Sequence, residues 1–446
     1  MQASPIYIPS ESMDADAYQQ PMPQTANTPS LENPEDSVDD STSRESWRDN
    51  KKPRQKALYL DNDSAPEHRL SHTLQLVEEL IKEKEILEAN KELIRCVALT
   101  RIIYGDGHWR LAQSYANLAH GYLTLRGLPA QAAQHAESAK EILLNGLDMS
   151  KSDEEKQAIL GTLVTLYYTL GAAHLIQNNG RESLHNLQKV EKILEELQTL
   201  DGGKAVVLKI SEKDLALALG RASVLQNKLN SAASYFEKVI DYVIMTEGDS
   251  TPELVTIYQE MAKAEQSRSK HDRAIEHLLQ AHSIAIALYN KASVEAAEAG
   301  LLLAKAYAVS GNYDDAAEMY FAESLRAYQA ALGPDESETL NTLVEYSKWL
   351  VQIGRNQEAY KLMNSTCSSH LKTSGDFSET VAEVFHLMGT ICLAESKMQK
   401  AYKLLKKCLE IQTAVYGSQH KKTRQTQELL NMLQKSPTTS EGNKTR

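Results

Sequence analysis

Residues 301–321 read LLLAKAYAVSGNYDDAAEMYF, and this stretch decides how the chain is expected to fold. Large apolar residues recur at helical spacing on both sides of a central glycine. The stretch has a fixed order of residue types on either side of Gly311. Before the glycine come a large residue, a small one and an aromatic, which are Leu303, Ala304 and Tyr307; after it come an aromatic, a small residue and an aromatic, which are Tyr313, Ala316 and Tyr320. The pattern predicts two helices that are joined by a short turn and pack closely where their small residues meet.

The pattern recurs with a period of about 42 residues. Gly333, Gly375 and Gly417 are 42 residues apart, each in a short polar loop, and Gly248 precedes Asn290 by the same interval. We expect these residues to end helices in the left-handed conformation, which glycine adopts without strain.

Inside the units, two small residues twelve positions apart mark the two helices of a hairpin. These pairs are Val77 and Ala89, Gly171 and Ser183, Gly220 and Ala232, Ala262 and Ala274, Ala304 and Ala316, Ser347 and Ala359, and Gly389 and Ala401. The pattern predicts eight hairpins that begin near residues 70, 112, 164, 212, 255, 297, 340 and 382, followed by one polar helix that covers the last apolar surface. Longer joints are expected at LDMSKSDEEK (147–156) and LDGGKAVVLKISEKD (200–214).

Two matching polar segments, IIYGDGHWRLAQ (102–113) and AVYGSQHKKTRQ (414–425), suggest either small binding sites or joints. Each has a tyrosine, a glycine and a histidine at the same spacing: Tyr104, Gly105 and His108, and Tyr416, Gly417 and His420. We interpret both as joints, in which the tyrosine closes one hairpin and the histidine begins the next helix.

The hairpin pattern is that of the tetratricopeptide repeat. The long unit and YGDGHWRLAQSYANLAHGYLTLRG (104–127) resemble the extended repeats of kinesin light chains. The chain more closely resembles the animal tetratricopeptide repeat protein 23 family, over residues 67–434, in three stretches: NKELIRCVALTRIIYGDGHW, YLTLRGLPAQAAQHA and KLLKKCLEIQTAVYG. The opening MQASPI is similar to the 23-like branch of that family. The resemblance implies an adaptor of the microtubule cytoskeleton, the primary cilium and Hedgehog-related complexes, with the centrosome, midbody and cilium base as candidate locations.

Residues 1–66 differ in composition from the rest of the chain. They hold eight of the twelve prolines and six basic against twelve acidic side chains, which supply −6 of the net charge of −12. The segment has too few large apolar residues for their burial to offset the entropy lost on ordering. We therefore expect a disordered acidic tail. Within it KKPRQK, residues 51–56, resembles a short basic import signal but is also common in solvated tails.

Composition also bounds the cellular setting. Cys96, Cys367, Cys392 and Cys408 form no C-x-x-C pair and mostly sit among apolar residues, which predicts reduced packing residues of an intracellular protein. No apolar run approaches the roughly 20 residues of a membrane span. The mildly acidic body argues against a general nucleic-acid binder.

Motifs for chemistry are missing from the sequence. The chain has no phosphate-binding glycine loop, no nucleophile elbow and no H-E-x-x-H zinc motif. His271, His277 and His282 are spaced by six and five residues, which scatters them around a helix. We therefore expect no catalytic, cofactor or metal site and no small-molecule substrate.

A row of cations follows the small residues of four consecutive first helices. Arg221, Lys263, Lys305 and Lys348 are spaced by 42, 42 and 43 residues, and we call them the basic ladder. They are expected to face a concave groove, preceded by His120 and by Asn117, which the resemblance to kinesin light chains implies to be a peptide-holding asparagine. The ladder either binds an acidic peptide or is neutralised locally by Glu260, Glu298, Glu345 and Glu383.

A second basic feature lies near the end of the repeats. Eight cations and one acid, Glu410, stand between residues 397 and 424. These cations, which we call the terminal patch, are Lys397, Lys400, Lys403, Lys406, Lys407, Lys421, Lys422 and Arg424. The patch is either an ordinary solvated face or a docking site for an acidic polymer such as the microtubule surface.

The sequence therefore predicts an all-α tetratricopeptide superhelix over residues 67–434, between a disordered tail at 1–66 and a flexible end at 435–446. The expected function is a cytoplasmic, non-enzymatic scaffold of the microtubule cytoskeleton that binds protein partners. The alternative is a cargo or motor adaptor of the kinesin-light-chain kind, which binds acidic peptides in the basic groove.

Overall fold

A computed structural model describes residues 65–146, 152–200, 209–311, 314–366 and 378–435. The tail up to residue 64 with KKPRQK, Tyr313, Cys367 and Gly375 lie outside the described residues. Within the described ranges the chain forms seventeen helices and no strand, which confirms the predicted all-α class. The predicted domain boundaries at residues 66 and 434 stay predictions.

The chain divides into two compact units. Unit 1 contains α1 to α5 and the end of α6, and unit 2 contains residues 178–188 and α7 to α17. The helices of unit 1 are α1 (Pro66–Lys82), α2 (Ile86–Tyr104), α3 (Trp109–Thr124), α4 (Pro129–Gly146) and α5 (Asp153–Ile176), and α6 (Gly180–Leu200) is shared. Those of unit 2 are α7 (Glu212–Leu225), α8 (Leu229–Glu247), α9 (Pro252–Ser267), α10 (His271–Tyr289), α11 (Val294–Ser310), α12 (Asp314–Ala331), α13 (Ser337–Gln352), α14 (Asn356–Thr366), α15 (Glu379–Ala394), α16 (Met398–Tyr416) and α17 (Lys421–Lys435).

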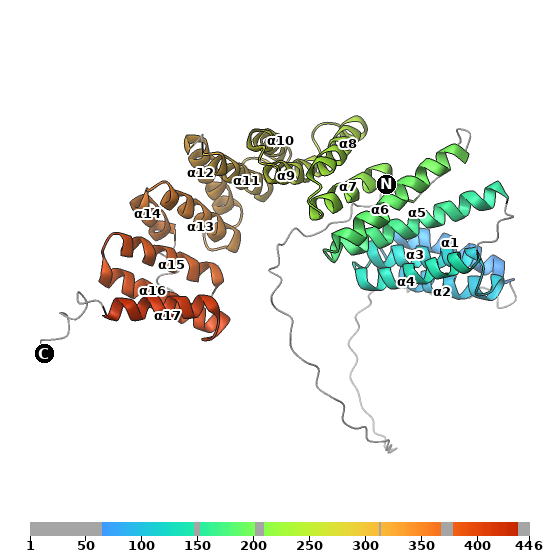
Figure 1. Cartoon of the computed structure of the whole chain (residues 1–446), viewed down its shortest axis with the longest axis horizontal. Helices are drawn as coiled ribbons and strands as arrows, with labels where there is room; N and C mark the ends of the chain where they lie inside the picture. Colours follow the sequence, from blue (N-terminus) through green and yellow to red (C-terminus); the bar gives the residue numbers. More distant parts are fainter. Residues whose placement is uncertain (1–64, 147–151, 201–208, 312–313, 367–377, 436–446) are drawn as a thin grey trace, which may run out of the picture. The chain divides into compact units, whose positions relative to one another are not determined.

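Unit 1 is built from hairpins whose helices lie side by side (Figure 1). The helix α1 pairs with α2 and α3 with α4, while α5 contacts both α3 and α4. One apolar cluster joins the first hairpin to α3 through Val77, Leu93 and Leu118, and a second packs Ala136 against Leu166 of α5. Each hairpin thus buries its apolar side against the next one, as a repeat array requires.

The helix α5 is unusual for its length and apolar character. It is long and apolar enough to cross a membrane by length and composition, but 67% of its most apolar stretch is buried inside the fold. Its start is fixed by Ser152, whose side chain accepts a hydrogen bond from the Glu155 backbone N–H. The segment 153–156, predicted to be part of a joint, is therefore helical.

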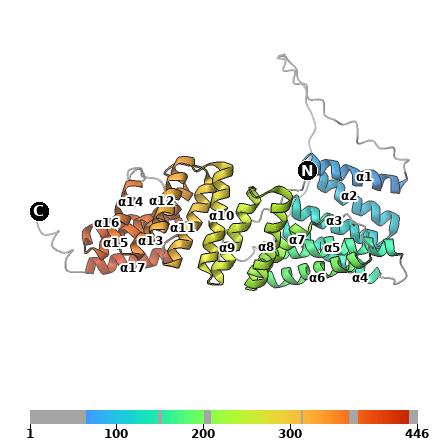
Figure 2. The same cartoon turned by 90° about the horizontal axis from the view of Figure 1, so that it is seen from above.

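Unit 2 repeats the hairpin five times and ends on a single helix (Figure 2). The pairs α7 with α8, α9 with α10, α11 with α12, α13 with α14 and α15 with α16 pack together, and α17 contacts α16. First helices of consecutive hairpins also touch, α9 with α11 and α13 with α15. Packed helix pairs in the described residues therefore include two in unit 1 and five in unit 2, and the expected total of eight hairpins stays a prediction.

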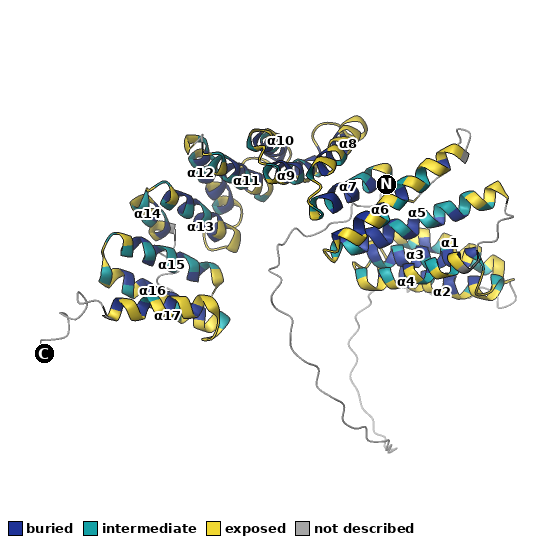
Figure 3. Ribbon diagram, in the orientation of Figure 1, coloured by how far each residue is buried: buried dark blue, intermediate teal, exposed yellow. Residues whose placement is uncertain are grey.

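Close packing inside a hairpin occurs at the predicted small residues, and the paired sides are buried (Figure 3). A Cβ atom added to Gly220 would lie 2.8 Å from the Phe236 ring, and one added to Gly389 would lie 2.8 Å from the Leu405 side chain. Neither contact leaves room for a methyl group, so the small residues set how closely the helices approach.

One predicted pair is wrong by a residue. In the hairpin of α11 and α12, Ala304 is fully buried but Ala316 is only half-buried, whereas Ala317 is fully buried. The interval is thirteen residues instead of twelve because α11 continues to Ser310, one residue further beyond its small residue than α9 does. The stretch that shows the repeat most clearly in sequence is thus the one that departs from its spacing.

The joints between hairpins have a positive φ, but the predicted left-handed helical conformation is wrong. Gly248 has φ 96° and ψ 177°, Gly417 has φ 83° and ψ 164°, and Gly105 has φ 82° and ψ 175°. This extended, positive-φ region is open almost only to glycine. Asn290 adopts it at φ 81° and ψ 169°, and its side chain accepts a hydrogen bond of 2.8 Å from the Ala292 backbone N–H.

The two matching polar segments are joints, as predicted. The Tyr104 and His108 rings stack with centroids 4.9 Å apart, and those of Tyr416 and His420 with centroids 4.5 Å apart. In each joint the histidine Nδ1 accepts a hydrogen bond from the backbone N–H two residues later, at 3.2 Å for His108 and 3.3 Å for His420. The histidine therefore caps the following helix instead of binding an ion.

The strained glycine of the first joint offers a test with a control in the same loop. Replacing Gly105 by alanine should cost about 1–3 kcal/mol of unfolding free energy, because alanine is strained at its φ of +82° although no atom lies within 4 Å. Gly107, with equal space and no positive φ, should tolerate alanine or gain up to about 1 kcal/mol. Urea unfolding followed by circular dichroism measures both, and equal losses would contradict the assignment.

Candidate functional site

The basic ladder lies on the first helices of unit 2. Arg221, Lys263, Lys305 and Lys348 belong to α7, α9, α11 and α13, one on each helix. Because first helices of consecutive hairpins are neighbours, a side chain at this position can reach the next first helix. We call the surface they form the first-helix face.

Three of the four ladder cations are paired with acids of the next first helix. The guanidinium of Arg221 donates from Nε and Nη2 to both carboxylate oxygens of Glu260, at 2.9 and 2.8 Å. Lys305 lies 3.0 Å from Glu345. Lys348 lies 2.7 Å from Glu383 and 3.1 Å from Glu345 of its own helix. Local neutralisation, one of the two readings of the ladder, therefore describes these three cations.

Lys263 is the exception. Arg221 pairs with Glu260, which stands three residues before the next ladder cation, and Lys305 pairs with Glu345, which stands three residues before Lys348. The equivalent position for Lys263, three residues before Lys305, is occupied by Leu302. Lys263 is exposed, and no residue in the described part of the chain forms an ion pair with its ammonium group. Glu298, expected to neutralise the ladder here, does not pair with it.

The pairs shift the titration of the groups that form them. Burial alone would raise the pKa of Glu345, but hydrogen bonds and charges from Lys305 and Lys348 outweigh burial and lower it. Burial likewise opposes the charge of Lys348, yet Glu383 and Glu345 raise its pKa. Both groups therefore stay ionised at neutral pH.

The two predicted groove residues of unit 1 lie on α3. Asn117 and His120 are half-buried and one turn apart. Nδ1 of His120 lies 3.5 Å from the Thr169 hydroxyl, and its ring lies 6.4 Å from the ring of Tyr168, both on α5. His120 thus contacts the neighbouring first helix, as the ladder cations do in unit 2.

The terminal patch lies on α16 and α17, with Lys397 just before α16. Two of its members have ion pairs, Lys397 with Glu395 at 2.6 Å and Lys422 with Glu379 at 2.7 Å. Two more lie over aromatic rings of neighbouring helices, Lys400 at 4.2 Å from the centroid of Tyr360 on α14 and Lys407 at 5.6 Å from that of Phe385 on α15. The remaining four are exposed and form no ion pair with any described residue: Lys403, Lys406, Lys421 and Arg424.

The patch extends around the end of the array instead of covering one face. Lys422 lines a pocket against α15, whereas Arg424 lines a separate depression with Leu409 and Thr413 of α16. Ala401, Leu404 and Cys408 belong to the buried side of α16, and Lys400 and Lys407 lie beside it, over rings of α14 and α15.

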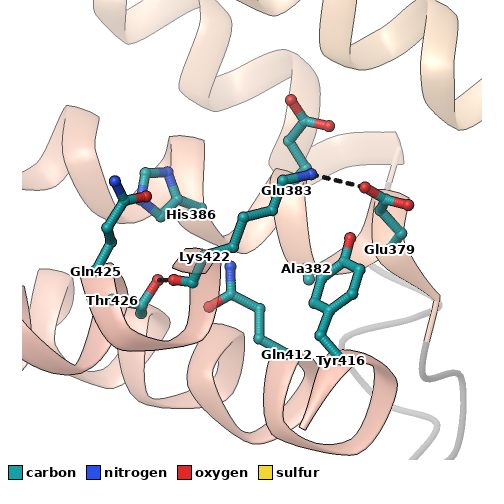
Figure 4. Close-up of a pocket in the computed structure, with 9 residues that line it drawn as sticks. All are labelled: Glu379, Ala382, Glu383, His386, Gln412, Tyr416, Lys422, Gln425 and Thr426. Atoms are coloured by element: carbon teal, nitrogen blue, oxygen red, sulfur yellow. Dashed lines mark hydrogen bonds and ion pairs between the residues drawn. The ribbon is translucent and has the colours of Figure 1, made fainter. Parts of the chain in front are cut away.

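The pocket against α15 was missed by sequence reasoning (Figure 4). It has a volume of about 170 Å³ and lies among α15, α16 and α17. Glu379, Glu383 and His386 come from one side of α15, and Gln412 and Tyr416 from one side of α16. Their helical spacing shows that each set shares a face, but only the packing of three helices brings the sets together.

Three cysteines and two histidines of α10 make packing contacts in the described part of the chain. Cys96, Cys392 and Cys408 are buried and form no disulfide there, and burial raises the pKa of Cys408 to about 12. His277 stacks on Tyr258 at 5.9 Å, and His282 meets the ring of Tyr320 edge-on at 5.5 Å. No group of three His, Cys, Asp or Glu side chains in the described ranges could hold a metal ion.

The paired part of the ladder makes a prediction about stability and pH. Glu345→Gln removes the partner of both Lys305 and Lys348, which should cost about 1 kcal/mol at pH 7 because half-exposed ion pairs contribute little each. Since the folded-state pKa of Glu345 is lowered, the contribution is complete above about pH 4.3 and lost as pH falls through the folded value.

Urea unfolding at pH 7 and in acid measures this difference. Glu410, which is exposed and forms no ion pair with any described residue, provides the control, because Glu410→Gln should change stability little at either pH. A loss for Glu345→Gln that persists in strong acid would show that its role is packing instead of charge pairing.

Comparisons with known proteins place the chain in a family. No family model matches. The chain is 46% identical to mouse tetratricopeptide repeat protein 23-like over 380 residues, which cover 85% of this chain and 82% of that protein. It is 36% identical to human tetratricopeptide repeat protein 23 over 389 residues, covering 86% and 83%.

Solved structures align more loosely. The kinesin light chain-like repeats of Podosopora anserina share 20% identity with a TM-score of 0.40, over 45% of this chain and 95% of that chain, which is too loose to bear on function. The two mammalian relatives match over most of this chain and over most of their own length. This chain therefore belongs to the tetratricopeptide repeat protein 23 family.

Proposed function

We propose that this protein is a non-enzymatic scaffold of the microtubule cytoskeleton, which docks on an acidic protein surface through the end of its repeat array. A helical-hairpin array offers long side-chain faces to other chains and needs no catalytic centre. The setting we propose is cytoplasmic, at microtubules of the centrosome, midbody or cilium base, with ciliary and Hedgehog-related complexes as partners. That setting follows from the family resemblance.

The contrast between the two basic features supports docking through the terminal patch. Three of the four ladder cations already form ion pairs with acidic side chains, so their charge is largely neutralised within the fold. In the patch, Lys403, Lys406, Lys421 and Arg424 are exposed and have no ion pair among the described residues. Exposed cations that outnumber the acids around them produce a positive potential that attracts acidic surfaces and weakens as salt rises.

Co-pelleting of the full chain with microtubules across a salt series tests this proposal. Reversing Lys403, Lys406 and Lys421 to glutamate should weaken binding by on the order of tenfold, since three exposed contacts of about 0.5 kcal/mol each sum to that factor. Binding by the unchanged chain should fall as salt rises.

A matched control separates the position of the charges from their number. Lys228, Lys270 and Lys291 are exposed lysines at hairpin ends, without ion pairs among the described residues, and reversing them changes the net charge equally. This variant should pellet like the unchanged chain. Equal loss in both variants, or binding that survives high salt and the patch reversal, would reject docking through the patch.

Lys263 favours a second candidate function, the adaptor that holds an acidic peptide on the first-helix face. Lys263 is exposed, and Leu302 occupies the position that an acid occupies next to Arg221 and Lys305, so a peptide carboxylate at Lys263 would gain a charged contact. The apolar cluster that Leu302 packs against includes Leu278 and Leu303, which fits a peptide with an aromatic residue next to its acids.

A fluorescent peptide with tryptophan flanked by acids tests the adaptor function. Lys263→Ala should weaken its binding by about three- to tenfold, whereas Lys291→Ala should leave it unchanged, and neither should alter thermal stability because both lysines are exposed. Fluorescence anisotropy measures the affinities. Unchanged affinity in Lys263→Ala would exclude this use of the first-helix face.

A further inference from the structure

We propose that the pocket among α15, α16 and α17 binds an arginine side chain of a protein partner. The proposal rests on the role of the chain as a protein-binding scaffold and adds a specific recognition site to it. The pocket is lined by residues of α15, α16 and the closing helix α17, which Figure 4 shows as sticks.

An unsatisfied acceptor in the pocket wall points to a ligand that donates hydrogen bonds. Gln412 is only 5% exposed, and its Oε1 atom is fully buried with no hydrogen-bond partner among the described residues. An unpaired buried polar atom carries a desolvation cost that a suitable partner removes. A donor that enters the pocket would satisfy this oxygen once the Gln412 amide turns toward it.

The carboxylates of the pocket can accept a further donor. Each already pairs with one lysine, Glu379 with Lys422 and Glu383 with Lys348, both at 2.7 Å, but a carboxylate has about four lone-pair sites and can accept from a second cation as well. Lys422 lowers the pKa of Glu379, so that carboxylate stays ionised, and it already holds a cation at 2.7 Å. Burial lowers the pKa of His386, so its imidazole is neutral at pH 7 and does not oppose a second positive charge.

Size and acceptor number favour arginine over lysine. The volume of about 170 Å³ is more than ten times the roughly 10–15 Å³ that one water requires, so a side-chain head group fits. Acceptors stand on two helices, Oε1 of Gln412 on α16 and the carboxylates of Glu379 and Glu383 on α15. A planar guanidinium has five N–H donors and can reach several of them at once, whereas a lysine ammonium is a compact point charge.

Saturation-transfer NMR on the full chain tests the site with three small probes. Acetyl-arginine methylamide should bind at least tenfold more tightly than its neutral isostere acetyl-citrulline methylamide, and acetyl-aspartate methylamide should not compete. Gln412→Leu should weaken arginine binding by on the order of tenfold, because it removes the buried acceptor. The same substitution should not lower the melting temperature, because it also removes an unsatisfied polar atom.

A second variant and a control complete the experiment. Glu379→Gln should also weaken arginine binding, whereas Glu410→Gln, on the exposed side of α16, should not. Equal binding of arginine and citrulline, full binding in Gln412→Leu, or preference for aspartate would overturn the proposal. Microtubule pelleting of Gln412→Leu should be normal, so failure of the pocket and failure of docking through the terminal patch remain distinguishable.

Discussion

The close approach of two helices at a pair of small residues is the constraint on which the whole chain depends. At Gly220 and Gly389 a single added methyl group would meet the facing side chain at 2.8 Å, so the hairpin has one interhelical distance. With that distance fixed, the apolar sides of each hairpin match those of the next, and the array can grow without one large core. The first helices then become neighbours and present their side chains as continuous faces.

Sequence alone predicts this architecture well because its determinants are local. Small residues at fixed spacing, turn glycines and the Tyr-Gly-His joints each act over one or two helical turns, and they specify the hairpins. Where the expectation was wrong, a local rule met a second constraint. The fully buried small residue of α12 is Ala317 instead of Ala316, because α11 extends one residue further beyond its own small residue. The glycines of the joints take an extended ψ because the chain must turn sharply from one helix into the next.

The candidate sites could be predicted only in part, because they depend on which side chains meet across helices. Spacing placed the basic ladder on the first helices. It could not show that Glu260 and Glu345 pair with ladder cations, whereas Lys263 forms no ion pair with a described residue. The pocket around Gln412 left no signal in the sequence, since its walls come from helices up to 43 residues apart, as the contact of Lys422 with Glu379 illustrates. A lysine or arginine that is neutralised by an ion pair within the fold cannot be told from an unpaired one in the sequence.

Hydrogen–deuterium exchange of the full chain with and without microtubules tests the central claim most directly, because it reports which helices are covered. The account predicts protection concentrated in α16 and α17, where exposed cations have no partner among the described residues, and little change in α9 to α13. Protection confined to the first helices of unit 2, or none at any salt concentration, would contradict docking through the terminal patch.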